Sequence, residues 1–303
     1  MNVANVYRGA TELTNVSKIY RGSIELWARS TAWLPSDEST LEGWFTTVNN
    51  DPSTGQVFTS DPMTKNGANV SQLNDLSGND RHLKQTNSSY QPPESIIDGM
   101  RSIDPNNVNQ HLFSDFDTSF DHGTENGVLV LAMQIDGNNT VYHGGINWGG
   151  NCYLLSENDD WEYSGSASSS RSGPNFRTLP TNRKWQRAIV SIQYQIGING
   201  RIRAYQFGTL GEETNQSSLG DMSTATGLTY ILFNFTTSFL NFGSRTHFLE
   251  MMNFHGQSTI AELDEVRQKA EGYLAHRMSS LGSQNSFWLD ELDTSHPYKL
   301  EAP

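Results

Sequence analysis

Residues 258–282 read STIAELDEVRQKAEGYLAHRMSSLG and contain the strongest helical period in the chain. Thr259 and Glu262 form a capping box at its start, and Gly282 is a suitable stop at its end. The spacing predicts an amphipathic helix over residues 259–281 whose apolar stripe faces a structure built earlier in the chain; the stripe consists of Ile260, Leu263, Val266, Ala270, Tyr273, Leu274, Met278 and Leu281. The opposite face is expected to be solvated and carries Arg267, Gln268, Lys269 and Glu271.

Most of the remaining chain is typical of short β-strands. Residues 127–135 predict a buried strand with the apolar run VLVLAM at its centre, and residues 185–194 predict a strand in which Ala188, Val190, Ile192 and Tyr194 recur at period two. Asn199-Gly200 predicts a hairpin turn, and further strands are expected at 228–235, 239–243 and 246–254. Short strands, local turn signals and one late helix predict an all-β antiparallel sandwich.

The composition is that of a globular, β-rich protein. The chain has 303 residues, enough for one large or two modest domains. Of these residues, 11% are aromatic and 17% are charged. The formal net charge of −13 argues against nucleic acid as a partner. The single cysteine, Cys152, leaves no intrachain disulfide and suits assembly in a reducing cytoplasm. Residues 1–8 lack the pattern of a secretory signal, and no apolar run is long enough for a membrane span.

The N-terminal segment contains a tandem repeat. Residues 6–13 read VYRGATEL and recur at 19–26 as IYRGSIEL. Each copy predicts two short strands around an Arg-Gly turn, because glycine supplies the positive φ that a tight hairpin needs. Residues 1–30 are therefore interpreted as a docking arm, and its candidate assembly residues are Tyr7, Arg8, Tyr20, Arg21 and Trp27. The alternative is a simple pair of strands that belongs to the main fold.

Three segments carry a resemblance to a known family. The run EGYLA occupies 271–275, residues 295–299 read SHPYK, and residues 70–83 read VSQLNDLSGNDRHL. They resemble the signature of concanavalin A-like, laminin-G-like (LamG) modules of bacteriophage virion proteins and bacterial surface proteins, although Leu73 replaces the family's usual tryptophan. The resemblance implies a concanavalin A-like jelly roll over residues 31–303, including the helix and the tail. The repeats of the arm are similar to hairpin repeats at the start of many phage head and tail proteins.

The loop at 74–80 has two interpretations. Asn74, Asp75, Ser77 and Asn79 readily hydrogen-bond their own backbone, which favours a self-satisfied turn. Related LamG modules sometimes hold calcium in such a loop, and Asp75 and Asp80 would then supply carboxylates. Calcium is the only cofactor that the sequence brings into question.

A polar and aromatic stretch follows residue 143. Trp148 and Trp161 lie among glycines and acids, as tryptophans that stack on sugar rings do, and Asn158, Asp159 and Asp160 are suited to binding hydroxyl groups. The alternative is that the tryptophans pack in the core and the acids form turns. The stretch therefore offers a candidate glycan site.

Catalysis has little support in the residue pattern. Asp160 and Glu162 would share a face if they lay on a strand, as the paired carboxylates of a glycoside hydrolase must, but their segment reads as a loop. The histidines are scattered, and no Ser-His-Asp, zinc or phosphate-loop pattern occurs. We expect a protein that is not an enzyme.

The resemblance and the residues together imply a structural protein on the surface of a virion. It would be a capsid decoration, a fibre or a tail-associated protein, assembled in the host cytoplasm, whose partners are other virion proteins, further copies of itself and host or environmental glycans. The alternatives are a carbohydrate-binding, lectin-like receptor-binding protein and, less favoured, a glycan hydrolase.

Overall fold

The computed structural model describes residues 6–8, 11–13, 18–21, 24–28, 33–50, 58–104, 110, 112–114, 125–136, 143–148, 152–157, 160–165, 175–176, 187–195, 201–215, 230–233, 245–281 and 286–303. The chain divides into two compact units, Met1–Trp33 and Leu34–Pro303. No helix in these ranges is long and apolar enough to cross a membrane.

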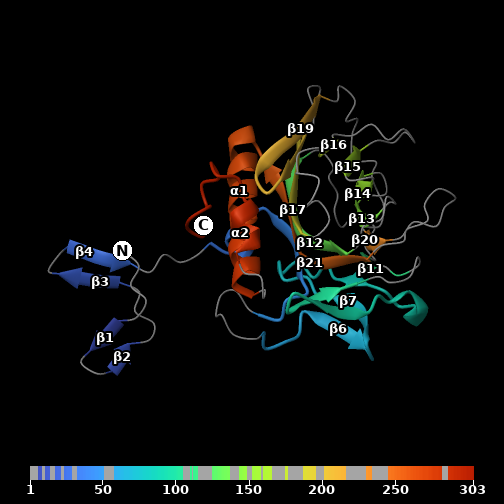
Figure 1. Cartoon of the computed structure of the whole chain (residues 1–303), viewed down its shortest axis with the longest axis horizontal. Helices are drawn as coiled ribbons and strands as arrows, with labels where there is room; N and C mark the ends of the chain where they lie inside the picture. The colour runs from blue at the N-terminus through green and yellow to red at the C-terminus, as the bar shows by residue number, and fades with distance from the viewer. Residues whose placement is uncertain are drawn as a thin grey trace. The chain divides into compact units, whose positions relative to one another are not determined.

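The first unit consists of two β-hairpins (Figure 1). In one, β1 (Val6–Arg8) pairs with β2 (Thr11–Leu13), and in the other, β3 (Lys18–Arg21) pairs with β4 (Ile24–Ala28). The repeat extends to the register, because the pair Tyr7 and Glu12 recurs as Tyr20 and Glu25. The predicted hairpins are thus confirmed, whereas the docking role of Tyr7, Arg8, Tyr20, Arg21 and Trp27 stays a prediction.

The second unit is an antiparallel β-sandwich. Its first sheet has the strand order β19-β18-β17-β12-β21-β10-β9, with β5 also paired to β21. Its strands are β5 (Leu41–Thr46), β9 (Glu94–Ile97), β10 (Met100–Ile103), β12 (Asn126–Asp136), β17 (Ala188–Gln195), β18 (Arg201–Gln206), β19 (Thr209–Asn215) and β21 (Arg245–Gln257).

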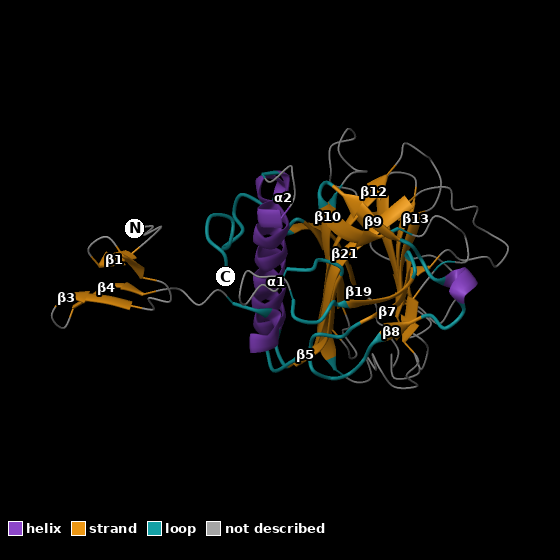
Figure 2. Cartoon of the chain, turned by 90° about the horizontal axis from the view of Figure 1, so that it is seen from below, coloured by secondary structure: helices purple, strands orange, loops and turns teal. Residues whose placement is uncertain are grey.

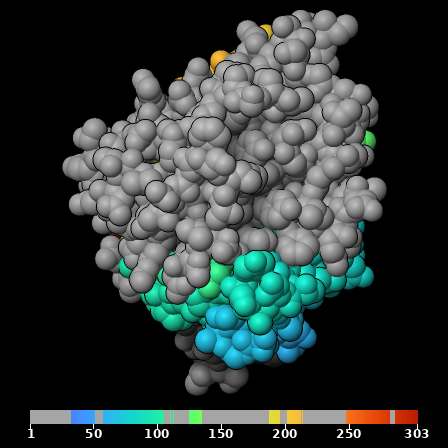
Figure 3. Space-filling view, turned by 90° about the vertical axis from the view of Figure 1, so that its right-hand side faces the viewer, coloured from blue at the N-terminus to red at the C-terminus, as the bar shows by residue number. Residues whose placement is uncertain are grey.

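The second sheet has the order β16-β15-β14-β13-β20-β11-β8-β7-β6. Its strands are β6 (Met63–Asn66), β7 (Asn69–Leu73), β8 (Leu83–Lys84), β11 (Leu112–Ser114), β13 (His143–Trp148), β14 (Cys152–Glu157), β15 (Asp160–Gly165), β16 (Asn175–Phe176) and β20 (Tyr230–Phe233). Short 3-10 turns lie at η1 (Pro35–Asp37) and η2 (Ser88–Tyr90). In Figure 3, the part of the chain coloured blue to green, within residues 58–104, gathers on one side of the surface.

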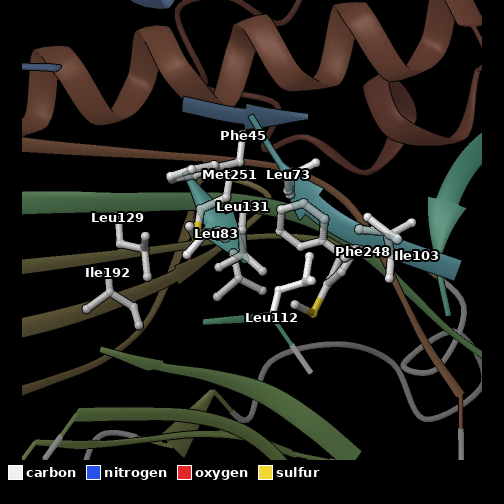
Figure 4. Packing of buried hydrophobic residues seen from close by; sticks show 14 of the residues in the cluster. Phe45, Leu73, Leu83, Ile103, Leu112, Leu129, Leu131, Ile192, Phe248 and Met251 are labelled. Atoms are coloured by element: carbon white, nitrogen blue, oxygen red, sulfur yellow. The ribbon is translucent and has the colours of Figure 1, made fainter. Parts of the chain in front are cut away.

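The hydrophobic core fills the space between the two sheets (Figure 4). Ala188, Val190, Ile192 and Tyr194 are all buried in it, so the alternation predicted along β17 is confirmed. The first sheet also contributes Phe45, Leu131 and Phe248, and the second sheet contributes Met63, Val70, Leu73, Leu83 and Leu112. Burial of so many large apolar side chains, each worth about 1.5–3 kcal/mol of transfer free energy, holds the sheets face to face.

The predicted helix is α1 (Ile260–Leu281), and it lies along the outer face of the first sheet (Figure 2). Its capping box is confirmed, because Glu262 N donates to Thr259 Oγ1 and Thr259 N donates to Glu262 Oε2, both at 3.2 Å. The apolar stripe is buried from Leu263 to Met278, while Ile260 at its start is exposed. Gly282 lies outside the described residues.

The prediction of a solvated opposite face on α1 is wrong for two residues. Arg267 and Glu271 are buried, because residues 286–303, which include α2 (Phe287–Glu291), fold back over the helix. The helix is therefore enclosed between the first sheet and the C-terminal tail, and both of its sides meet protein.

Several strands differ from the expectations. The stretch that includes Asp160 and Glu162 is not a loop but the strand β15, paired on both sides. Strand β19 follows a tight turn in which Phe207 and Gly208 both have positive φ, of 50° and 81°. The hairpin between β17 and β18 is present, whereas Asn199-Gly200 and the expected strand at 239–243 lie outside the described residues.

Candidate functional site

The carboxylate of Glu271 lies at the centre of the contact between α1, the first sheet and the tail. Its Oε1 accepts a hydrogen bond of 2.6 Å from Ser191 Oγ on β17. Its Oε2 accepts one of 2.6 Å from Arg267 Nη1 and lies 3.2 Å from His296 Nε2 in the tail. Burial by itself raises the pKa of Glu271, but the positive charge of Arg267 and the hydrogen bonds from His296 and Ser191 outweigh it and lower the pKa. The group is therefore a buried, ionised link between three elements.

Arg267 is held on its other side by an aromatic ring. Its guanidinium carbon lies 3.7 Å from the ring centroid of Tyr205 on β18, and its Nη2 lies 3.4 Å from Asp264 Oδ1. The ring of Tyr205 and the carboxylates of Glu271 and Asp264 thus take the place of water around the guanidinium, and these contacts offset the cost of its burial.

A second buried carboxylate, Glu250 on β21, forms a parallel link further along the helix. Its Oε1 accepts hydrogen bonds from Trp44 Nε1 at 2.8 Å and from the Tyr273 hydroxyl at 3.1 Å. Its Oε2 accepts from Arg277 Nε at 2.8 Å and from the Thr46 hydroxyl at 3.1 Å. Arg277 is therefore buried in an ion pair that joins the helix to the first sheet.

The tail motif completes the enclosure of the helix. A Cβ added at Gly272 would lie 2.5 Å from Tyr298 Cβ, so the glycine makes room for this ring. His276 Nε2 lies 2.9 Å from the Tyr298 carbonyl oxygen. Lys299 Nζ donates to the carbonyls of Asp290 and Leu292 at 2.8 and 2.7 Å and so closes the end of α2. The residues that carry the family resemblance at 271–275 and 295–299 therefore have a structural role here: they fasten α1 to the sandwich.

The loop at 74–80 is closed by the carboxylate of Asp75. Asp75 Oδ1 accepts from the backbone N–H groups of Trp44 and Ser77, at 3.0 and 2.9 Å. Asp75 Oδ2 accepts from the Ser77 hydroxyl at 2.7 Å and from Arg81 N at 3.0 Å. The four donors use the lone-pair positions of the carboxylate, and Gly78 has a positive φ of 90°. The geometry is that of a self-satisfied turn.

Calcium at this loop stays a prediction. Asp80 is exposed and has a φ of 56°. In the part of the chain that the structure describes, no group of three or more histidine, cysteine, aspartate or glutamate side chains is arranged to hold a metal ion. A cation at Asp75 would have to displace backbone donors that already neutralise the carboxylate.

The two candidate sugar-stacking tryptophans lie on β13 and β15, which flank β14 in the second sheet. Trp148 pairs with Cys152 on β14, while Trp161 pairs with Ser156 on the same strand. Cys152 and Ser156 are four residues apart, so the two tryptophan positions are separated by about 13 Å along the strands. The two positions are therefore not adjacent in the sheet. Of the polar candidates, Asp160 starts β15 next to Trp161, whereas Asn158 and Asp159 lie outside the described residues.

The register also assigns a face to each tryptophan position. Directly paired residues share a face, and so do residues two positions apart on one strand. Trp148 therefore shares a face with Ile146 on β13. Ile146 pairs with Ile231 on β20, and Ile231 pairs with Leu112 on β11. Leu112 is fully buried in the core. Trp161 belongs to the same face, because Tyr163, two residues later, pairs with Leu154, the partner of Ile146. The register thus places both tryptophan positions on the face of Leu112, and sugar binding by either tryptophan stays a prediction.

The other face of the second sheet carries a row that no local sequence pattern reveals. Lys84 on β8 pairs with Phe113, which pairs with Tyr230; Tyr230 pairs with Asn147, and Asn147 pairs with Tyr153. We call Phe113, Tyr230, Asn147 and Tyr153 the aromatic row. Its residues come from four strands and are spread over more than a hundred positions in sequence, so only the strand pairing brings them together.

Three carboxylic residues lie on the same face as the aromatic row. Glu157 pairs with Asp160, and Glu162 lies two residues further along β15. Both Glu157 and Tyr153 occupy odd-numbered positions of β14, which share one face of a strand of period two. Asp160 and Glu162 therefore share a face, as the paired carboxylates of a glycoside hydrolase must, and Glu157 lies on the same face.

The comparisons with known proteins identify the fold. No family model matches the chain, and no curated protein matches it by sequence. The binding domain of Paraclostridial Mosquitocidal Protein 1 matches with a TM-score of 0.55 at 10% identity, over 78% of this chain and 53% of that one. The ligand-binding domain of botulinum neurotoxin serotype D, in complex with N-acetylneuraminic acid, matches with a TM-score of 0.50 at 11% identity, over 76% and 50%. The receptor-binding domain of botulinum neurotoxin type G matches with a TM-score of 0.50 at 12% identity, over 78% and 52%.

The chain spans about half the length of these solved structures, and at such identities the likeness shows the fold alone. None of the three is a phage or LamG protein, so the phage origin implied by the sequence motifs stays a prediction. The predicted fold class is confirmed: residues 34–303 form an all-β antiparallel sandwich with one long helix near the C-terminus.

Proposed function

We propose that this chain is a non-enzymatic attachment module of a virion surface, as a capsid decoration, a fibre or a tail-associated protein, and that its sandwich recognises glycans. The observation that carries the glycan part is the likeness of the sandwich to three toxin binding domains, one of which holds N-acetylneuraminic acid. The virion part rests on the LamG-like motifs and on the tandem hairpins.

The packing of α1 against the first sheet limits where on the sandwich a ligand is recognised. The outer face of the first sheet is closed by α1: its Glu271 accepts a hydrogen bond from Ser191 on β17, and its Arg277 forms a buried ion pair with Glu250 on β21. Recognition is therefore assigned to the second sheet or to the loops that join the strands.

The tandem hairpins support attachment to a partner. A two-stranded hairpin is marginal by itself in water, and this chain has two in a unit of its own. A partner surface on the virion or on a further copy of the chain would supply the missing apolar burial, with Tyr7, Tyr20 and Trp27 as the candidate contacts.

Two measurements test the proposal. Printed oligosaccharide arrays with the full chain should show concentration-dependent binding to a defined set of glycans, and an array without any binding above that of an unrelated β-sandwich would overturn the glycan part. Light scattering should show an oligomer for the full chain and a monomer for a chain that starts at Leu34. If both chains are monomers and neither binds other virion proteins, the docking role of the hairpins is wrong.

A glycan hydrolase is the second candidate, and the placement of Asp160 and Glu162 on β15 favours it. Incubation of the full chain with the glycans that bind on the array, followed by chromatography, should show no shortened products. Product that disappears in Glu162→Gln would instead establish the hydrolase.

A further inference from the structure

We infer that the hairpin between β6 and β7 is a site of spontaneous covalent modification, at which Asn66 converts into aspartate and isoaspartate through a cyclic imide with Gly67. The reaction takes place within the chain, and water is its co-reactant. The site is separate from glycan recognition and from the N-terminal hairpins, so it goes beyond the proposed function.

The chemistry follows from the order of the two residues. The backbone nitrogen of Gly67 attacks the side-chain carbonyl carbon of Asn66; a C–N bond forms, and the amide nitrogen leaves as ammonia with the proton of the attacking nitrogen. Water then opens the five-membered imide at one of its two C–N bonds, which gives either aspartate or an isoaspartate whose chain runs through the former side chain. Asparagine is a thermolabile residue, and glycine after it leaves the attacking nitrogen unobstructed because it has no Cβ.

The reacting groups are open to solvent. Residues 64–68 are all exposed, and a Cβ built on Gly67 would meet no atom within 4 Å. Gly67 is the first residue of a two-residue turn and has a φ of 65°. The pair of Asn66 and Asn69 is the last one before this turn, so the ladder between β6 and β7 does not tie down the nitrogen of Gly67.

Asn66 is held loosely at the end of its strand. Among the described strands, β6 is at the edge of the second sheet and pairs on one side, with β7. A β-bulge between Thr64 and Lys65 separates the end of the hairpin from the rest of this pairing. The side chain of Asn66 donates to Gln91 Oε1 at 3.4 Å, which is longer than the usual hydrogen bond of about 2.7–3.2 Å. Local opening of the hairpin end therefore suffices to bring the amide carbon to the nitrogen.

The same dipeptide at Asn126-Gly127 provides a matched comparison within the chain. It starts the central strand β12, which is paired with both β17 and β21. Asn126 Nδ2 donates to the carbonyl oxygen of Gln257 at 2.9 Å, and a Cβ built on Gly127 would clash with the hydroxyl of Tyr194. The ladder would have to open before Asn126 could cyclise, so the fold should protect Asn126 while it leaves Asn66 reactive.

The experiment ages the full chain in mildly alkaline buffer and follows each asparagine by peptide mapping with mass spectrometry. Conversion appears as the mass increase that replacement of an amide NH2 by OH gives, and labelling with an isoaspartyl methyltransferase identifies isoaspartate. A parallel sample is kept unfolded in urea, where Asn66 and Asn126 have the same following residue and no protection by the fold. Asn66→Ser removes the reacting amide and gives the background of the peptide.

In the folded chain, Asn66 should convert at least about tenfold faster than Asn126, because Asn126 has to wait for the opening of a central strand. In urea the two rates should be similar. The product at Asn66 should contain both isoaspartate and aspartate, and Asn66→Ser should carry no label in this peptide. The third Asn-Gly pair, at 199–200, lies outside the described residues, and its peptide is scored separately.

Three results would overturn the inference. Equal rates at Asn66 and Asn126 in the folded chain would show that the fold does not distinguish the two sites. Conversion of Asn66 in urea but not in the folded chain would show that the hairpin protects it. Aspartate without isoaspartate at Asn66 would mean direct hydrolysis of the side chain instead of cyclisation. None of these results depends on glycan binding, which the oligosaccharide array tests by itself.

Discussion

His296 Nε2 lies 3.2 Å from Glu271 Oε2, and this contact joins the C-terminal tail to a helix residue that also receives a hydrogen bond from the first sheet. Three segments thus meet at one fully buried carboxylate. The free energy of unfolding should depend on this group more than on any exposed charge of the helix.

Glu271→Gln is expected to lower the free energy of unfolding by about 3 kcal/mol or more, because the guanidinium of Arg267 would stay buried without its main counter-charge. Urea unfolding followed by circular dichroism measures the change. Glu265→Gln is the matched control: Glu265 pairs with Lys269 at 2.8 Å on the same helix, but its side chain is 61% exposed, so the change should be about 0.5 kcal/mol or less. Equal losses in the two variants would contradict the account.

The same carboxylate should make the protein sensitive to acid. The pKa of Glu271 is lowered in the folded state from an ordinary value of 4.5, so its contribution to stability is present above pH 4.5 and is lost as the pH falls below that value. Unfolding experiments between pH 7 and pH 3 should therefore show a steeper acid loss for the wild type than for Glu271→Gln. Parallel curves would mean that Arg267, His296 and Ser191 do not hold the carboxylate of Glu271 ionised.

Gly272 should accept no larger side chain while Tyr298 is present. The added Cβ of Gly272→Ala would lie 2.5 Å from Tyr298 Cβ, and overpacking of this kind costs about 1–3 kcal/mol. In the double variant Gly272→Ala, Tyr298→Gly the total loss should be smaller than the sum of the losses in the two single variants, because the Cβ of Tyr298 that causes the clash is gone. Additive losses in chemical denaturation would show that the helix and the tail do not meet here.

The turn at 74–80 should depend on Asp75 and not on Asp80. Asp75→Asn replaces an acceptor of four hydrogen bonds and is expected to cost about 2 kcal/mol, whereas Asp80→Asn changes an exposed residue and should cost less than about 0.5 kcal/mol. Melting temperatures of both variants, with and without calcium, test this. A calcium-dependent rise in the wild type that Asp80→Asn abolishes would instead support the calcium site.

The sequence predicts those parts of the fold that depend on neighbouring residues. The capping box of Thr259 and Glu262 and the alternation from Ala188 to Tyr194 are local patterns, and both are confirmed. Burial of Glu271 is not local: its partners Ser191 and His296 are 80 and 25 residues away in sequence. The i,i+4 pair of Arg267 and Glu271 reads as a solvated ion pair until the tail is placed over it.

The candidate site residues also divide into those that the local sequence indicates and those that only strand pairing brings together. Trp148 and Trp161 stand out in the sequence as single residues, but strand pairing separates their positions by about 13 Å along the strands. Tyr153 and Tyr230 do not stand out, since each lies in an ordinary short strand. A single added signal, the pairing of β13 with both β14 and β20, is what aligns them.

The most direct test of the proposed glycan recognition is a crystal structure of the full chain with the oligosaccharide that binds most tightly on the array. The account predicts sugar bound to the sandwich, on the second sheet or on the loops that join its strands. Sugar bound on the N-terminal hairpins, or against α1 on the outer face of the first sheet, would contradict it.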